Sequence, residues 1–216
     1  MHPKDPALDS SGFVLLSDYV PSAVQEIRYF TTYNFVGERI DGYEQPIAIA
    51  SLETARALKS AANELNVRGY RLKVFDAYRP TTAVKHFIFW AIEDEDIRMK
   101  PYFYPRIDKQ DSFKLGSIAK QSSHSRGSAV DLTLLDMATG RELDMGSPFD
   151  LFDERSHPDF AGITDEQASN RALLSGVMER NGFVPYECEW WHFMLGDEPY
   201  PETYFSFPVT EKSLRS

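Results

Sequence analysis

A carboxylate stands inside the run of this chain that is most typical of a buried strand. Residues 129–135 read AVDLTLL, and a short run of valine, leucine and threonine predicts a strand with at least one buried face. Burying an unpaired carboxylate costs on the order of several kcal/mol of folding free energy, unless the carboxylate meets a cation or a metal. Any fold that buries this strand must therefore bring a positive partner to Asp131.

Two histidines are the candidates to share a metal with Asp131. His124 precedes the strand, and His192 lies in a second unusual stretch, ECEWWHFM, at residues 187–194. Two imidazoles and one carboxylate form the three-ligand set of a catalytic zinc site that keeps its fourth position open for water. If the sheet brings these side chains together, one Zn²⁺ per chain is the cation that Asp131 needs.

Glu189 is the candidate general base. A carboxylate beside a zinc-bound water can take its proton and later return it to a leaving amine. Glu189 and His192 are three positions apart, however, and such positions point to opposite faces of a flat strand. We therefore predict either a bulge in this strand or a Glu189 that precedes its regular pairing.

The periodicity of the chain predicts a mixture of helices and strands. Apolar residues three or four apart predict a helix over residues 52–65 that Gly69 ends, and a capping-box pattern at residues 164–167 begins a helix that ends at Asn181-Gly182. The remaining expected elements are a helix over 81–92 with Pro80 at its first position, strands over 70–75, 129–135 and 183–195, and irregular strands on the outside of the core in the first 50 residues.

These elements do not alternate regularly along the chain. They predict a single α+β domain over residues 1–216, in which helices flank a central antiparallel or mixed sheet and the zinc site lies on that sheet.

The charge of the chain excludes several classes of partner. The 33 acidic and 23 basic residues give a formal charge of −10, so nucleic acid and anionic membrane surfaces would be repelled. No run of 18 apolar residues and no signal-peptide pattern is present, and Cys188 has no partner for an internal disulfide. We therefore expect a cytoplasmic protein, or a periplasmic one if a signal peptide has been removed.

Other conspicuous residues have ordinary structural interpretations. The acidic cluster at residues 93–96 is expected to be a solvated face, and His86 and His157 to have surface or packing roles. Strand alternation predicts a buried, inert thiol at Cys188 on the face opposite Glu189, and Trp190-Trp191 is interpreted as core and pocket wall. No phosphate-binding loop is present, so no organic cofactor is expected.

The spacing of these groups resembles a known pattern. Ser122-x-His124-x-x-Gly127-x-Ala129-x-Asp131, followed by Glu189-x-x-His192, resembles the zinc peptidases that cut D-Ala-containing cell-wall peptides. The chain is closer still to the D-alanyl-D-alanine dipeptidases, the cytoplasmic zinc enzymes associated with vancomycin resistance. This likeness extends from about residue 41 to 208 and leaves residues 1–40 poorly matched; its further stretches are DGY at 41–43, DAYRP at 76–80, GSPFD at 146–150, DERSH at 153–157 and EWWHF at 189–193.

The resemblance implies a role for each matching residue. It implies zinc ligation by His124, Asp131 and His192, general base and acid catalysis by Glu189, and oxyanion stabilisation by Arg79, for which a fixed cation is worth on the order of 3 kcal/mol. It also implies hydrolysis of D-Ala-D-Ala to two D-alanines, in cell-wall precursor metabolism or glycopeptide resistance, and suggests a homodimer. The residues that would hold the substrate's free amino group are Asp150, Tyr43 and Ser122.

Two other functions share parts of this pattern. A zinc D,D-carboxypeptidase would use the same metal ligands but would accept an acylated amino end, against which Asp150 argues, because a buried acid selects a free ammonium. A non-catalytic binding module could use zinc for structure alone, and Glu189 and Arg79 would then have no role. Individually, Arg79 could pair with an acid at a strand end, and Asp150 could cap a turn.

Overall fold

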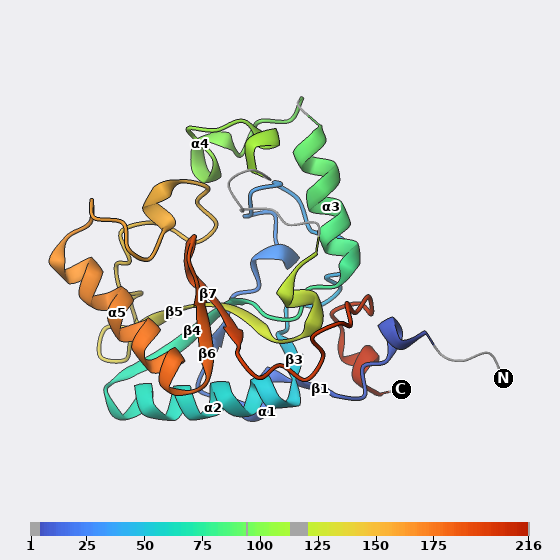
Figure 1. Ribbon diagram of the computed structural model, residues 1–216, viewed down its shortest axis with the longest axis horizontal. Helices are drawn as coiled ribbons and strands as arrows, with labels where there is room; N and C mark the ends of the chain where they lie inside the picture. Colours follow the sequence, from blue (N-terminus) through green and yellow to red (C-terminus); the bar gives the residue numbers. More distant parts are fainter. Residues whose placement is uncertain (1–4, 94, 113–120, 216) are drawn as a thin grey trace.

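A five-stranded sheet in the order β2-β4-β5-β7-β6 carries the core of the protein (Figure 1). The computed structural model describes residues 5–93, 95–112 and 121–215. β2 is parallel to β4 and all other neighbours are antiparallel, so the sheet is mixed and the α+β prediction is confirmed. The strands are β2 Val24–Gln25, β4 Tyr70–Asp76, β5 Ala129–Asp136, β6 Phe183–Tyr186 and β7 Glu189–Leu195.

Helices lie on both sides of this sheet. Figure 1 shows α2 (Leu52–Val67) and α5 (Asp165–Arg180) on one side, and α3 (Thr81–Ile92) and α4 (Lys100–Phe103) on the other. The Ser51 side chain caps α2, and the predicted capping box of α5 is formed by Thr164 and Gln167. The expected helices are thus confirmed, although Pro80 precedes α3 as its N-cap and is not its first residue.

The last predicted strand is two strands. β6 and β7 form an antiparallel hairpin whose turn is Glu187 and Cys188, so a single strand over residues 183–195 was wrong. β7 also pairs with β5, with His192 opposite Asp131. The register of the hairpin is irregular at the start of β7, as a bulge there requires. Glu189 precedes the pairing with β5, so both forms of the prediction for this residue are met.

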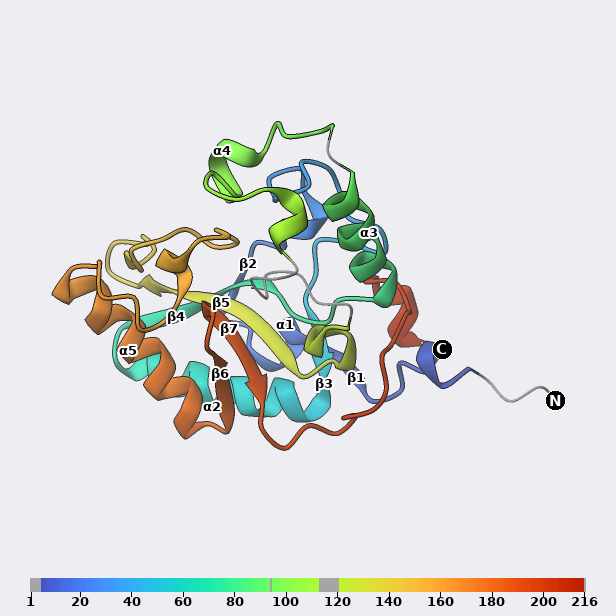
Figure 2. The same ribbon diagram turned by 45° about the horizontal axis from the view of Figure 1, so that its top comes forward.

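The N-terminal segment belongs to the core, against our prediction that it wraps around the outside. β1 (Phe13–Leu15) pairs with β3 (Ile49–Ser51) in a two-stranded sheet, and α1 (Leu16–Tyr19) follows β1 (Figure 2). Its turns are irregular, but the large apolar side chains between them are buried. The buried residues include Phe13, Leu16, Ile27, Tyr29, Phe35, Ile40 and Ile49.

One of these N-terminal side chains supports the segment that carries His124. Phe13 packs so closely on Gly127 that a Cβ at this glycine would lie 2.2 Å from the Phe13 ring. Gly127 also has a φ of +74°, which L side chains rarely adopt, so only glycine fits here. The N-terminal strand therefore fixes the end of the short helix η4, Ser123–Arg126.

The acidic cluster behaves as predicted at Glu93 and Glu95, which are exposed, while Asp94 lies outside the described residues. Within the described residues, no helix has the length and apolar character that crossing a membrane requires.

Short 3₁₀ helices make up much of the remaining described structure. Besides η4, these are η1 Pro6–Leu8, η2 Arg28–Phe30, η3 Lys109–Ser112, η5 Glu154–Ser156 and η6 Glu211–Arg215.

Candidate metal and catalytic site

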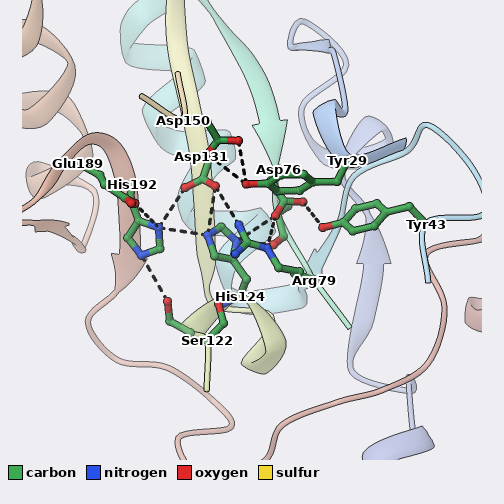
Figure 3. Close-up of polar contacts among 12 residues, drawn as sticks. Tyr29, Tyr43, Asp76, Arg79, Ser122, His124, Asp131, Asp150, Glu189 and His192 are labelled. Atoms are coloured by element: carbon green, nitrogen blue, oxygen red, sulfur yellow. Dashed lines mark hydrogen bonds and ion pairs between the residues drawn. The ribbon is translucent and has the colours of Figure 1, made fainter. Parts of the chain in front are cut away.

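Three elements bring the predicted ligands together at one point. β5 and β7 are adjacent and place Asp131 opposite His192, and η4 adds His124 from the segment before β5. One ligand atom from each residue lies within 4.8 Å of the others. Figure 3 shows the two imidazoles and the carboxylate turned toward one another.

The hydrogen bonds around the cluster fix which atoms face its centre. Nδ1 of His124 lies 2.6 Å from the backbone carbonyl of Ala77, which can only accept, so Nδ1 carries the proton and Nε2 presents a lone pair. That Nε2 lies 3.3 Å from Oδ2 of Asp131 and 3.1 Å from Nδ1 of His192. Nδ1 of His192 lies 3.0 Å from Oδ1 of Asp131. Acceptor atoms this close together suit a shared cation.

The protonation of the cluster also suits a metal. Burial alone would raise the pKa of Asp131, but the two facing imidazoles outweigh it and hold this pKa well below its usual value. Burial lowers the pKa of His192, although Asp131 opposes the shift. A carboxylate at Asp131 and a neutral imidazole at His192 are forms that bind divalent metals, and the Asp131, His124 and His192 set is one that zinc uses, so the residues present fit zinc.

The cluster lines a cavity of about 380 Å³. One part of its wall is apolar and aromatic, and polar side chains converge beside the candidate metal ligands. The apolar lining includes Phe35, Val84, Phe87, Trp191 and Met194, and the polar lining includes Arg79, Ser122, Asp150 and Glu189. A mostly apolar pocket with a few convergent polar groups is the usual form of a small-molecule site.

Glu189 points into this cavity beside the imidazole of His192. Its Oε2 lies 4.0 Å from Nδ1 of His192, and its side chain is 18% exposed. Burial first, and then the charges of Asp131 and Asp150, raise the pKa of Glu189 well above its usual value. The bulged start of β7 thus brings the acid to the face that carries His192, as the spacing required.

Asp150 lies at the cavity wall with a tyrosine that the sequence did not reveal. The hydroxyl of Tyr29 is 3.0 and 3.1 Å from the two carboxylate oxygens of Asp150. Burial and the charge of Asp131 raise the pKa of Asp150 to about 8. Asp150 has a φ of +62°, and strained backbone of this kind is often found at functional sites. Tyr29 lies in η2, and no sequence motif identifies it as a residue of the site.

Arg79 follows β4 and is held between two acids. Its Nε donates to Oδ2 of Asp76 at 2.9 Å, and its Nη2 donates to Oδ2 of Asp131 at 3.3 Å. The guanidinium also lies 4.9 Å from the ring centre of Tyr29 and 5.2 Å from that of Phe87. Arg79 therefore pairs with acids, as the structural interpretation had it, and it lines the cavity as well.

Ser122 and Tyr43, the other two residues predicted to hold the substrate, have different positions. Ser122 lines the cavity and caps η4, with its Oγ 3.3 Å from the amide nitrogen of His124. Tyr43 is buried and is not among the described residues that line the cavity. Its hydroxyl donates to Oδ1 of Asp76 at 2.7 Å. Tyr43 therefore lies behind the cavity-lining Tyr29, whose ring centre is 5.7 Å from its own, and its contact with a substrate stays a prediction.

The remaining conspicuous residues are placed largely as expected. Trp191 lines the cavity, while Trp190 is buried and donates to Ser147. His86 lies 3.1 Å from Glu38, away from the cluster, and His157 lines a separate cavity. The prediction for Cys188 was wrong: this half-buried thiol lies in the hairpin turn, because the strand alternation on which the prediction relied is interrupted there.

Comparison with known proteins gives one consistent result. A family model described as D-Ala-D-Ala dipeptidase, of the Peptidase M15 type, matches residues 9–210, and so includes most of the poorly matched N-terminal part. D-alanyl-D-alanine dipeptidases from Enterococcus faecium and Enterococcus faecalis are each 44% identical to the chain, over 92% and 93% of its length and 98% and 99% of theirs. One from Streptomyces coelicolor is 38% identical over 91% of the chain and 98% of its own length.

Proposed function

The chain belongs to the D-Ala-D-Ala dipeptidase family of metallopeptidases, and we propose that it is a zinc enzyme that hydrolyses D-Ala-D-Ala to two D-alanines. One observation carries the proposal: a single cavity brings the His124, Asp131 and His192 cluster together with an acid, a cation and a second, buried acid. Each group has a separate part in the cleavage of a free dipeptide.

The reaction needs one water and one proton shuttle. A zinc ion held by His124, Asp131 and His192 would polarise the scissile carbonyl and lower the pKa of a water to about 7. Glu189 takes a proton from the attacking water and returns it to the departing amine, so the C–N bond breaks and a carboxylic acid and an amine are formed. The position of Glu189 beside His192 supports this role.

Arg79 stabilises the negative charge that develops on the scissile oxygen. A guanidinium keeps its charge at all relevant pH values, and Arg79 is held at the cavity wall within reach of the metal ligand Asp131. Ser122, which lines the same cavity, helps to hold the free amino group of the substrate.

Asp150 and Tyr29 recognise the free amino end. Asp150 is buried beside the hydroxyl of Tyr29, and burial first, then the charge of Asp131, raises its pKa although Arg79 and Arg28 oppose the shift. A substrate ammonium pairs with this carboxylate, whereas an acylated peptide would leave it buried without that cation.

The substitution Asp150→Asn is expected to raise KM for the free dipeptide about 10- to 100-fold, because a charge-assisted hydrogen bond to the ammonium is worth roughly 1.5–3 kcal/mol. Steady-state kinetics with D-Ala-D-Ala would measure the change. Asp144→Asn is the matched control, since Asp144 bonds Gln167 at the start of α5 and lies outside the cavity. An unchanged KM in the Asp150 variant would remove this residue from recognition.

The proposed function itself is tested by the release of D-alanine from three compounds. The purified protein should cleave D-Ala-D-Ala and leave both N-acetyl-D-Ala-D-Ala and a longer peptide ending in D-Ala-D-Ala intact. Cleavage of the blocked compounds would support a D,D-carboxypeptidase instead. Bound zinc without cleavage of any of the three would support a zinc-stabilised binding module.

The same proposal includes a setting for the reaction. The dipeptide places it in cell-wall precursor metabolism or glycopeptide resistance, and a single cysteine, Cys188, accords with a cytoplasmic location.

A further inference from the structure

A buried arginine of α5 holds both flanks of the segment that carries Asp150. Nε of Arg171 donates to the backbone carbonyl of Met145 at 2.6 Å. Its Nη1 and Nη2 donate to the carbonyls of His157 and Arg155 at 2.6 and 2.7 Å. Arg171 is 5% exposed and is not among the described residues that line the cavity. Any effect that it has on a substrate must therefore pass through another residue.

We infer that Arg171 and Ser156 are positioning residues for Asp150: they fix the segment 145–157 and so set where the Asp150 carboxylate meets the free amino end of the substrate. The inference rests on the proposed function for its kinetic consequences, and on the observed hydrogen bonds for its geometry. It gives the stretch DERSH, at residues 153–157, a function that the sequence pattern alone does not reveal.

The guanidinium of Arg171 suits this task because its N–H groups form a rigid planar fork. Each of its three nitrogen atoms bonds one carbonyl oxygen, and these oxygens come from both sides of Asp150 in the chain. A buried charge is costly unless its hydrogen bonds are made, so the release of any of the three carbonyls is opposed. A lysine would keep the charge, but its ammonium is a single point that cannot hold all three carbonyls in the same geometry.

Side chains inside the segment draw its two flanks together. Oγ of Ser156 donates to the carbonyl of Leu151, the residue after Asp150, at 2.6 Å, and it lies 3.4 Å from Oγ of Ser147. Ser147 in turn accepts from the indole nitrogen of Trp190 at 2.9 Å, which ties the segment to β7. Figure 1 shows the segment, in gold, beside α5. It is thus fastened to a helix and to the strand that carries the candidate general base.

Asp150 needs this support because its backbone is strained. Its φ of +62° lies in the left-handed region, which a residue with a side chain keeps only where the surrounding structure imposes it. Figure 3 shows the Asp150 carboxylate turned toward the hydroxyl of Tyr29. If the segment were released, Asp150 could relax to an ordinary backbone conformation and its carboxylate would leave Tyr29. The candidate metal ligands would stay in place, since η4, β5 and β7 carry them.

The substitution Arg171→Lys keeps the charge and removes the planar fork. We expect KM for D-Ala-D-Ala to rise about 10-fold and kcat to stay within about two-fold, because the amino-end contact is weakened while the reacting groups keep their positions. Arg180→Lys is the matched control: Arg180 lies on the same helix and bonds Glu64 of α2. This control should leave both constants unchanged.

Ser156→Ala is the second variant, and it decides the matter if the lysine variant does not fold. It removes one buried hydroxyl and no charge, so we expect a smaller rise in KM, about 3-fold, with kcat unchanged. A lower melting temperature with a normal KM, in a variant that folds, is the result of a merely structural role and would overturn the inference.

A double-mutant cycle shows whether the effect passes through Asp150. When Asp150 is already replaced by Asn, neither Arg171→Lys nor Ser156→Ala should raise KM further, because the carboxylate that they position is gone. A full additional rise in that background, or a fall in kcat with a normal KM in either single variant, would overturn the inference.

Hydrogen exchange tests the geometry without a substrate. The backbone amides of residues 146–156 should exchange about 10-fold faster in Arg171→Lys than in the wild type, and no faster in Arg180→Lys, as measured by mass spectrometry. Equal exchange in the wild type and in Arg171→Lys would contradict the inference. Failure of the wild type to release D-alanine, with the exchange result as expected, would instead count against the proposed function.

Discussion

Replacing Glu189 with glutamine is expected to reduce kcat for D-Ala-D-Ala by about 10²- to 10⁴-fold, the usual contribution of a general acid–base group. Glutamine keeps the size and the hydrogen-bonding reach of the side chain but cannot take a proton from water at neutral pH. Because Glu189 is not one of the three candidate ligands, the bound metal should stay at one ion per chain. The measurement is kcat together with the metal content of the same preparation.

The matched control is Glu187→Gln in the adjoining turn. Glu187 is exposed, so its replacement removes the same charge close to the site without touching the cavity. Normal turnover in this control excludes a general electrostatic effect. If the Glu189 variant kept full turnover with bound zinc, another group would have to move the proton, and the assignment would be wrong.

Removal of the metal is expected to abolish turnover and to lower the melting temperature. Without a cation, the carboxylate of Asp131 and the bare Nε2 of His124 face each other at 3.3 Å inside the protein. Zinc that binds only the folded state stabilises it by about 4 kcal/mol when its free concentration is 1,000 times Kd. Zinc added after chelation should therefore restore both activity and thermal stability.

Substitution of a ligand tests whether the effect comes from this site. His192→Ala should lose both the bound zinc and the thermal stabilisation by zinc, whereas His86→Ala should keep both, because His86 contacts Glu38 outside the cavity. Elemental analysis and thermal unfolding with and without chelator measure the two quantities. Full activity in protein that holds far less than one metal per chain would contradict the zinc mechanism.

The long elements of this fold could be predicted because each carries a local signal. α2 has apolar residues every three or four positions, and α5 has its capping box, so both helices could be located before the structure was known. β5 could be predicted from its apolar run, in which the charged Asp131 stands among apolar neighbours. The conflict between this charge and its burial is resolved by partners from three other segments, namely Arg79, His124 and His192.

The hairpin of β6 and β7 could not be separated into its strands in the same way. Its turn residues, Glu187 and Cys188, are not the glycine, asparagine or proline that usually mark a tight turn. Because apolar and aromatic residues lie on both sides of this turn, the sequence pattern predicted a single strand. The spacing of Glu189 and His192 nevertheless predicted an irregularity, because both side chains were needed at one site.

Tyr29 and Asp76 were missed for a different reason. Each acts through a contact with a residue far away in the sequence: Tyr29 with Asp150, and Asp76 with Tyr43. Neither contact leaves a periodic pattern, and the 3₁₀ helix that carries Tyr29 is only three residues long. Asp76 begins the stretch DAYRP at residues 76–80, so its closeness to Arg79, a candidate catalytic residue, was the signal that the sequence offered.

The order in which the sheet is assembled has a consequence for synthesis of the protein. β7 pairs with β5 within the sheet, yet it follows β4, β5 and α5 in the chain and carries the last candidate ligand, His192. A nascent chain on the ribosome therefore has an open edge on β5 and only two of the three candidate ligands until β7 has emerged. Since the ribosomal tunnel holds back the newest residues, the candidate site can close only after the chain beyond β7 has been synthesised far enough to release His192 from the tunnel.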